Sequence, residues 1–432
     1  MSSPHSPIRT AKIACRRGLG TVSLLLAMAR AVAAGPPPYN FSTATAQLAE
    51  NLDLYGPGVA ASIEQRGLPI FSYQSGSITL TSKQGIASCS KWLSGAIVLI
   101  LAEQGYFDLD DRIGEYLPVF EAAGKGHPTL RQCFAMTSGF YQTELGYEID
   151  RTLTLEESVN LIAANVPIVF PPGTQLAYEG AGMQIVGRIC EVVTGKSWHT
   201  LAAGLLFQPL GMRQSDYLYF DPNPAIAGGA RSTAEDYLKF LRMILGNGAA
   251  PDGTVILSSR SVQEFFTNQT PGLTEYHSPW PLSLFYPYQT RPDYGMGSWI
   301  QAQPGAGAPV EEVSSPGAFG TYPWVDRKRG LTGIIFTFKL AGLSALPNNN
   351  IRILSQIRTE IDRVGLPAPA DFAPLSISPL PQGRLRLDWG GGGRLETTTN
   401  LQDWNNLPVP FPPFIENPGQ SGQPAAWYRV VP

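Results

Sequence analysis

The sequence predicts an α/β (α+β) fold in which strands from both ends of the chain form a sheet around an inserted helical region. Residues with high strand propensity are dense early, at Leu48–Gly76, and late, at Tyr294–Gln301 and Gly330–Leu340. The segment between them has the apolar spacing of helices, and a further helix is expected at Asn350–Val364. Strands that flank a helical middle therefore indicate one sheet with a helical subdomain.

The early strands are predicted to form a hairpin. The β-like stretches Val59–Ile63 and Ile70–Tyr73 are separated by Gln65-Arg66-Gly67, which has the composition of a turn. After the hairpin, a helix that is apolar on all sides is expected from Ser88 to Gly105, and such a helix belongs at the centre of a domain. Three more helices are expected, the last with a capping start at Ser232–Glu235: Leu155–Ala164, Gly182–Thr194 and Thr233–Leu245.

The length and composition are those of a globular protein. The chain has 432 residues, of which 43% are hydrophobic and 15% are charged, and at roughly 150 residues per domain this indicates two or three domains. The 45 glycines and 38 prolines indicate many turns and irregular loops. Because five basic residues and no acidic ones lie in the first 34 positions, the rest of the chain is acidic, which argues against nucleic acid as a partner.

Residues 1–34 are predicted to be an export signal peptide. A basic segment precedes the apolar run Gly18–Ala29, and Ala31-Val32-Ala33-Ala34 supplies the small residues of a cleavage site. The run is shorter than the roughly 20 residues that span a bilayer, so a retained membrane anchor is the weaker alternative. The mature chain is expected to begin near Gly35 in the periplasm or outside the cell. Arg16-Arg17 leaves the twin-arginine route open as an alternative.

The C-terminal part is predicted to be a separate small module. Residues 365–383 are rich in Pro and Ala, as linkers are. Beyond them, 384–432 contains three strand-like segments, Arg384–Trp389, Arg394–Thr399 and Trp427–Val431. The main domain is accordingly placed at 35–364, followed by the linker and an all-β module of about 50 residues, which is marginal alone.

The cysteines and histidines do not indicate a metal site, a cofactor or a Ser-His triad. Cys89, Cys133 and Cys190 are odd in number and lack C-x-x-C spacing, so they are interpreted as buried apolar residues, with one disulfide plus a free thiol as the alternative. No G-x-S-x-G, H-E-x-x-H, P-loop or dinucleotide-binding motif is present. We expect no metal and no cofactor.

The strongest chemical candidate is Ser88-Cys89-Ser90-Lys91, at the start of the apolar helix. A three-residue step on a helix brings the Ser88 hydroxyl and the Lys91 amine to one face. Burial would lower the pKa of Lys91, so that its neutral form could accept the proton of a serine nucleophile. Such a spacing also arises by chance on ordinary exposed helices, but this is the only S-x-x-K in the chain.

Several collinear motifs resemble the serine β-lactamase and penicillin-binding-protein superfamily, specifically its class C-like branch with the family VIII esterases. The S-x-x-K element is one of that superfamily's motifs. The resemblance runs from about Pro57 to Val364 and implies a β-lactamase-like antiparallel sheet with a helical subdomain. Its motifs are Ile86–Lys91, Glu103-Gln104-Gly105, Tyr116-Leu117-Pro118, Thr137-Ser138-Gly139, Phe170–Thr174 with Tyr178, Gln208–Met212, Gly228-Gly229 with Ser232-Thr233 and Asp236, and Tyr294–Gly297.

By position, the resemblance implies the roles of the site residues. Ser88 would attack a carbonyl, Lys91 would take its proton, and Tyr178 would move protons to the leaving group and from the deacylating water, through an acyl-enzyme. The segment Ser314–Gly320 would be the edge strand beside the nucleophile, with the N–H groups of Ala318 and Ser88 forming the oxyanion hole. Small residues there, such as Gly317, would let the substrate approach the backbone.

Two departures from the family pattern concern the expected substrate-binding positions Gly180, Ser315 and Gly317. Gly180 stands where β-lactamases have Asn or Ser, and Ser315 stands where they have Lys or His. Because the missing groups would hold the amide and the carboxylate of a β-lactam, ester hydrolysis is favoured over antibiotic hydrolysis. The expected function is that of a secreted serine hydrolase acting on a small ester or amide.

The alternative is a catalytically silent domain that senses cell-wall peptides, with the C-terminal module as a surface-attachment element. The partner is therefore a small ester or amide, or a cell-wall peptide. The sequence does not indicate an oligomeric state. The aromatic loop Tyr276–Tyr288 is equally consistent with the wall of a pocket and with a packed surface loop.

Overall fold

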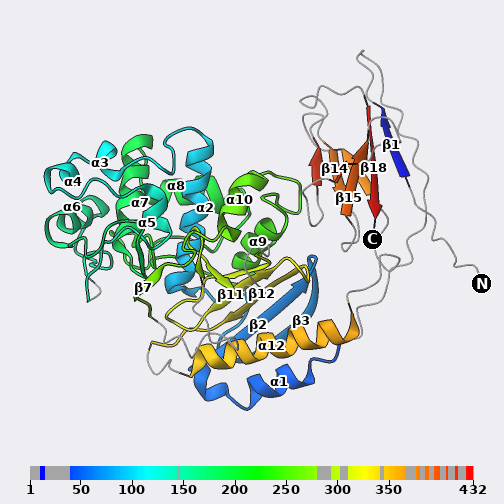
Figure 1. The fold of residues 1–432 in the computed structure, drawn as a ribbon. Helices are drawn as coiled ribbons and strands as arrows, with labels where there is room; N and C mark the ends of the chain where they lie inside the picture. Colours follow the sequence, from blue (N-terminus) through cyan, green and yellow to red (C-terminus); the bar gives the residue numbers. More distant parts are fainter. Residues whose placement is uncertain are drawn as a thin grey trace, which may run out of the picture.

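Figure 1 shows the computed structural model of the chain. The structure describes residues 39–143, 146–279, 293–301, 310–340 and 345–365. Beyond these it describes only strand backbone, at 10–14, 376–379, 385–388, 394–398, 405–406, 414–416 and 425–431.

The core of the fold is a seven-stranded antiparallel sheet with the order β3-β2-β12-β11-β10-β9-β8. Two strands come from the start of the chain and five from its later part, so the predicted sheet built from both ends is confirmed. The bounds are β2 (Gly58–Gln65), β3 (Leu68–Gly76), β8 (Asp293–Tyr294), β9 (Trp299–Gln301), β10 (Glu312–Ser314), β11 (Tyr322–Asp326) and β12 (Leu331–Phe336).

The predicted hairpin is formed by β2 and β3. Its two-residue turn is Arg66-Gly67, and both residues have positive φ, at 53° and 78°. Turns of this kind match the right-handed twist of the flanking strands. All of β2 is buried, whereas most of β3 is exposed or half-buried, because β2 lies inside the sheet and β3 forms its edge.

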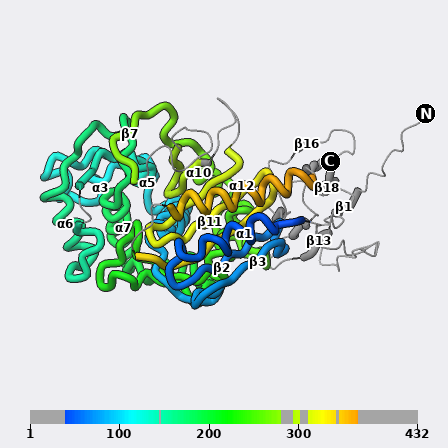
Figure 2. The backbone as a smooth tube through the Cα atoms, turned by 90° about the horizontal axis from the view of Figure 1, so that it is seen from below, coloured from blue at the N-terminus to red at the C-terminus, as the bar shows by residue number. Residues whose placement is uncertain are grey.

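Two helices from opposite ends of the main domain cover one face of the sheet. They are α1 (Ser42–Ala49) and α12 (Leu346–Val364), which lie side by side beneath the strands (Figure 2). Leu48 of α1 and Ile353 and Ile357 of α12 join one apolar cluster with the sheet. The helix α12 starts four residues before the predicted Asn350, because Leu346 is buried in the same cluster and extends the helix by packing.

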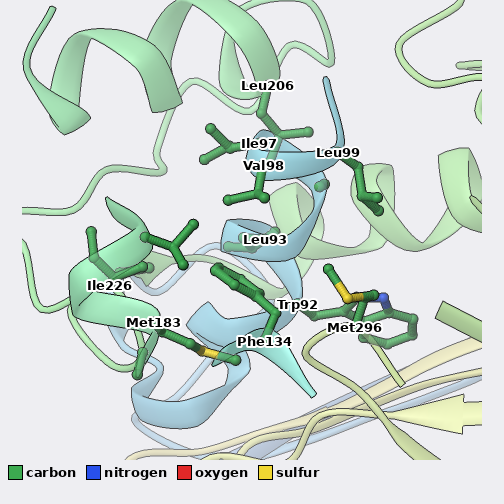
Figure 3. Packing of buried hydrophobic residues seen from close by; sticks show 14 of the residues in the cluster. Trp92, Leu93, Ile97, Val98, Leu99, Phe134, Met183, Leu206, Ile226 and Met296 are labelled. Carbon is green, nitrogen blue, oxygen red and sulfur yellow. The ribbon is translucent and has the colours of Figure 1, made fainter. Parts of the chain in front are cut away.

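The helical subdomain covers the other face, and α2 (Ser90–Glu103) lies at its centre. Every residue of α2 from Ser90 to Leu101 is buried, as the all-round apolar pattern predicts. Figure 3 shows Trp92, Leu93 and Ile97 of α2 among side chains from several other segments. The surrounding helices are α3 (Ile113–Tyr116), α4 (Pro118–Ala122), α5 (Leu130–Phe134), α6 (Leu155–Asn165), α7 (Ala181–Thr194), α8 (Trp198–Ala202), α9 (Ala234–Leu245) and α10 (Ser259–Phe266).

The predicted helices at 155–164, 182–194 and 233–245 correspond to α6, α7 and α9, with ends that differ by one residue. Thr233 is the N-cap of α9, since its hydroxyl accepts a hydrogen bond from the Asp236 N–H at 3.1 Å. Short strand pairs complete the subdomain: β4 (Gln84–Gly85) with β6 (Arg231–Ser232), and β5 (Gln175–Ala177) with β7 (Thr274–His277).

The C-terminal module consists of strands, as expected, but it begins earlier than the predicted Arg384. Strand β13 (Ser376–Pro379) lies within the predicted linker and pairs with β14 (Leu385–Asp388), where Ile377 faces Leu387. The apolar Ile377 within a Pro-rich segment gives this stretch the alternation of a strand. The other strands are β15 (Arg394–Thr398), β16 (Asn405–Asn406), β17 (Phe414–Glu416) and β18 (Ala425–Val431).

The predicted signal segment contains one strand, β1 (Thr10–Ala14), which pairs with β18. The signal peptide therefore stays a prediction, and its removal would take β1 out of this sheet. Within the part of the chain that the structure describes, no helix has the length and apolarity needed to cross a membrane. Cys89, Cys133 and Cys190 are free and buried, which confirms their interpretation as core residues.

Candidate active site

The nucleophile candidate Ser88 lies in a 3₁₀ turn, Ala87–Cys89, that leads into α2. Ala87 has a φ of 45°, which is unfavourable for a residue with a side chain, so the surrounding contacts must hold the turn in place. The Tyr237 hydroxyl donates to the Cys89 carbonyl at 2.8 Å, and the Ser90 hydroxyl donates to the Ala87 carbonyl at 2.6 Å. Ser88 itself is half-buried while both of its neighbours are buried, so the turn presents its hydroxyl to the surface.

Lys91 lies where the three-residue step predicts it. Its Nζ is 3.2 Å from the Ser88 Oγ and 3.0 Å from the Ala227 carbonyl oxygen. The side chain is only 4% exposed, and burial lowers the pKa of Lys91 to about 8, against the opposing effect of nearby carboxylates. About a tenth of the lysine is then neutral at pH 7, so it can act as a base for Ser88.

Tyr178 lies close to Ser88 and Lys91, although it comes from a distant part of the sequence. It follows β5, and its N–H donates to the carbonyl of His277, the last residue of β7, at 2.9 Å. The ring stacks on Trp299 with centroids 5.1 Å apart, and the Lys91 Nζ is 4.7 Å from the Tyr178 ring centroid. Burial raises the pKa of Tyr178 well above its usual value, although a hydrogen bond with Ser88 opposes the rise. Tyr178 is therefore a neutral phenol at pH 7 and carries its proton next to Ser88.

The predicted edge segment lies against the nucleophile turn. The Ser315 hydroxyl donates to the Ser88 carbonyl at 3.0 Å and approaches the Gly297 carbonyl at 3.3 Å. An ideal Cβ at Gly317 would lie 2.2 Å from the Ile86 carbonyl oxygen and 3.1 Å from the Cys89 Sγ. Only glycine at position 317 therefore lets this segment come so close to the turn.

The geometry is consistent with the predicted oxyanion hole. Ala318 is exposed beside the turn, and neither its N–H nor that of Ser88 donates to a protein acceptor among the described residues. Two free N–H donors next to a nucleophile are what an oxyanion needs. Ser315, in contrast, is 1% exposed and turned toward backbone carbonyls, so it holds the turn in place, and its contact with a substrate stays a prediction.

The structure adds two carboxylates that the sequence reasoning missed, Glu148 and Glu179. Glu179 accepts hydrogen bonds from the Gly182 N–H at 3.1 and 3.0 Å at the start of α7. Glu148 is 8% exposed and accepts from the Gln142 amide at 3.0 Å. The position of Glu179 between Tyr178 and Gly180 was a signal that could have been followed, but nothing in the sequence places Glu148 near the site.

Glu148 lies next to the position where the family has a side chain and this protein has Gly180. An ideal Cβ at Gly180 would lie 3.6 Å from the Glu148 Cγ and 3.8 Å from its Oε1. The pKa of Glu148 is raised, and that of Glu179 is raised to about 8, in both cases mainly by burial. Both carboxylates favour the cationic form of Lys91, so they limit how far burial lowers its pKa.

The site thus brings together Ser88, Lys91 and Tyr178 beside the segment that contains Gly317 and Ala318. The family profile described as Beta-lactamase matches residues 48–357, which include all of these positions. The chain belongs to the Beta-lactamase family. This confirms the resemblance stated from the motifs, and membership supports a hydrolase-like function.

Three proteins of known name or structure are similar to the chain. The chain is 27% identical over 348 residues to "Penicillin-binding protein 4" of Amycolatopsis lactamdurans, across 69% of this chain and 84% of that protein. A candidate beta-lactamase of Bacteroides dorei is 28% identical with a TM-score of 0.67, across 75% of this chain and 99% of that chain. EstCE1, described as a hydrolase with promiscuous acyltransferase activity, shares the fold at 16% identity and a TM-score of 0.59, across 73% and 97%.

The described histidines include His199 and His277, which lie in α8 and β7. His199 lies in α8, where its Nε2 is 3.4 Å from an Asp221 carboxylate oxygen, and the structure describes no group of three or more His, Cys, Asp or Glu side chains that could hold a metal. Of the aromatic loop 276–288, Tyr276 and His277 belong to β7. Residues 280–288 lie outside the described residues.

Proposed function

We propose that the protein is an exported serine hydrolase that cleaves a small ester through an acyl-enzyme on Ser88. The observation that carries this proposal is the 3.2 Å distance between the Ser88 Oγ and the Nζ of a buried Lys91. A lysine whose pKa is lowered to about 8 is neutral often enough to accept the serine proton.

The reaction follows from the positions of these groups. The Ser88 oxygen bonds to the substrate carbonyl carbon while its proton passes to neutral Lys91, and the N–H groups of Ser88 and Ala318 stabilise the negative oxygen. When the tetrahedral intermediate collapses, the bond to the leaving group breaks and Tyr178 donates a proton to it. Lys91 returns a proton to Tyr178. Water then attacks the acyl-enzyme by the same steps and releases the acid and Ser88.

An ester is favoured over a β-lactam because the site lacks polar groups that would hold one. Gly180 offers no side chain, and the Ser315 hydroxyl is engaged with the Ser88 and Gly297 carbonyls. Instead of an added cation, the site has the buried carboxylate Glu148. An anionic substrate would meet an unfavourable field there. Export is supported by the basic and apolar pattern of residues 1–34.

A fluorophosphonate probe tests the proposed nucleophile. We expect the folded protein to be labelled, and we expect Ser88→Ala to abolish labelling, whereas Ser72→Ala, which changes an exposed serine of β3, should leave labelling unchanged. p-Nitrophenyl butyrate should be hydrolysed and nitrocefin should not. Absence of labelling in folded protein would contradict the proposal and favour the cell-wall-peptide sensor, and turnover of nitrocefin alone would overturn the preference for esters.

A further inference from the structure

Four aromatic side chains that the proposed reaction does not use lie together near the nucleophile. Tyr219, Phe220, Phe319 and Phe338 form what we call the aromatic cluster. The ring centroids are 5.0 Å apart for Phe319 and Phe338, 5.5 Å for Tyr219 and Phe319, and 4.8 Å for Tyr219 and Phe220. All four are half-buried, so the cluster keeps apolar surface in contact with solvent.

The aromatic cluster borders the oxyanion hole. Phe319 directly follows Ala318, and its carbonyl accepts a hydrogen bond from the Lys339 N–H at 3.0 Å, next to Phe338. On the nucleophile side, an ideal Cβ at Gly85 would lie 2.6 Å from the Tyr219 ring. Gly85 is three residues before Ser88, so the cluster touches both segments that frame the nucleophile.

The register of the sheet places the aromatic cluster and Tyr178 on opposite sides of Ser88. Tyr178 packs on Trp299 of β9 and on Tyr294 of β8. At the same end of the sheet, the segment that follows β10 holds Ser88 through Ser315. Phe319 lies later in the same segment, near the start of β11, and Phe338 follows the end of β12, which pairs with β11. The strand order β12-β11-β10-β9-β8 therefore separates the two groups.

Arg151 closes the outer side of the aromatic cluster. Its guanidinium carbon is 5.4 Å from the Tyr219 centroid and 5.1 Å from the Phe220 centroid, although the residue itself is exposed. A cation at these distances is attracted to the faces of both rings. The aromatic cluster thus offers an apolar surface beside Ala318, with the charge of Arg151 at its edge.

We propose that the aromatic cluster is the subsite for the acyl group, and that it selects an aliphatic or aryl acyl group of several carbons. This inference rests on the proposed ester hydrolysis. Because Tyr178 protonates the leaving group, the leaving group lies on the Tyr178 side of the carbonyl carbon. The acyl group then extends to the opposite side, where contact with the four rings removes its apolar surface from water.

The test compares kcat/KM for p-nitrophenyl acetate, butyrate and hexanoate. The hexanoyl chain is four methylene groups longer than the acetyl group. With about half of this added surface buried against the aromatic cluster, kcat/KM should rise about tenfold or more from acetate to hexanoate. Phe338→Ala should reduce this hexanoate-to-acetate ratio at least about threefold, and Phe338→Leu should restore part of it. The control is Tyr106→Ala, since Tyr106 is 42% exposed beyond the far end of α2, and it should leave the ratio unchanged.

A second pair of substrates distinguishes the acyl side from the leaving-group side. Hydrolysis of ethyl acetate and hexyl acetate is measured by the release of acid. Their kcat/KM values should differ less than those of p-nitrophenyl acetate and p-nitrophenyl hexanoate. A preference for the longer alcohol chain would overturn the assignment. Equal kcat/KM values for acetate, butyrate and hexanoate would also overturn it, provided that the wild-type protein hydrolyses the acetate through Ser88. Absence of any Ser88-dependent hydrolysis would overturn both this inference and the proposed function. If Phe338→Ala does not fold, the wild-type series and Phe338→Leu decide.

Discussion

Lys91 is surrounded by groups with opposite effects on its pKa. Burial lowers the pKa to about 8, while Glu179 and Glu148 oppose that shift. Since the neutral amine is the proposed base, activity should rise with pH and level off above about pH 8. The profile should be measured as kcat/KM for a p-nitrophenyl ester, corrected for spontaneous and Ser88→Ala rates.

Glu148→Gln should move the rise in that profile to lower pH. The charged carboxylate favours the lysine cation, so its removal lowers the pKa of Lys91 further, and we expect a displacement of roughly half a pH unit. Glu50→Gln is the matched control, because Glu50 is exposed at the end of α1, on the opposite face of the sheet. A displacement to higher pH would contradict this account of the site.

Single residues differ in how far the sequence alone could place them. Ser88 and Lys91 are related by local helix geometry, and Tyr178 by a motif at a known position in the family. Glu148 is brought to Gly180 only by tertiary folding, through a segment without a recognisable pattern. The engagement of the Ser315 hydroxyl with backbone carbonyls also depends on the approach of two segments that are distant in sequence.

At the scale of elements, the contact between the edge segment and the nucleophile turn should control catalysis. Gly317→Ala would place a Cβ against the Ile86 carbonyl and push Ala318 away from Ser88. Because the loss of one oxyanion donor costs a factor of 10² or more, we expect kcat to fall about a hundredfold, with a smaller change in KM.

Gly204→Ala is the control for this substitution, since a Cβ at Gly204 meets no atom within 4 Å. Thermal melts should show that both variants fold. Equal kcat values for Gly317→Ala and wild type would contradict the proposed position of the oxyanion hole.

Helices were easier to predict than the pairing of strands. The apolar spacing of α6, α7 and α9 and the cap at Thr233 are local properties, and their ends agree within one residue. The segment 294–301 was predicted only to have strand propensity. It contributes to two strands, β8 and β9, because Gly295 and Gly297 turn the chain between them, and Gly297 has a φ of 80°. Strand β13 was read as linker since prolines dominate its surroundings.

At the scale of the whole molecule, the hydrolase body should be independent of the C-terminal module. All of the proposed site residues lie between Ser88 and Phe338, and the family match ends at residue 357. A chain that ends after Gly365 should therefore keep its melting temperature within about 3 °C. It should also be labelled by the fluorophosphonate at about the rate of the full chain. Aggregation, or a large loss of labelling, would show that the module supports the body.

The pairing of β2 with β12 also determines when the protein can become active. During synthesis, β2 emerges long before its neighbour β12, and until then one edge of β2 lacks its partner strand and its residues lack their buried surroundings. Ser88 likewise lacks the proposed oxyanion donor Ala318 until the segment that contains it has been synthesised. If the chain is exported during synthesis, as we propose, it would thus cross the membrane unfolded, and the proposed ester cleavage would begin only at the destination.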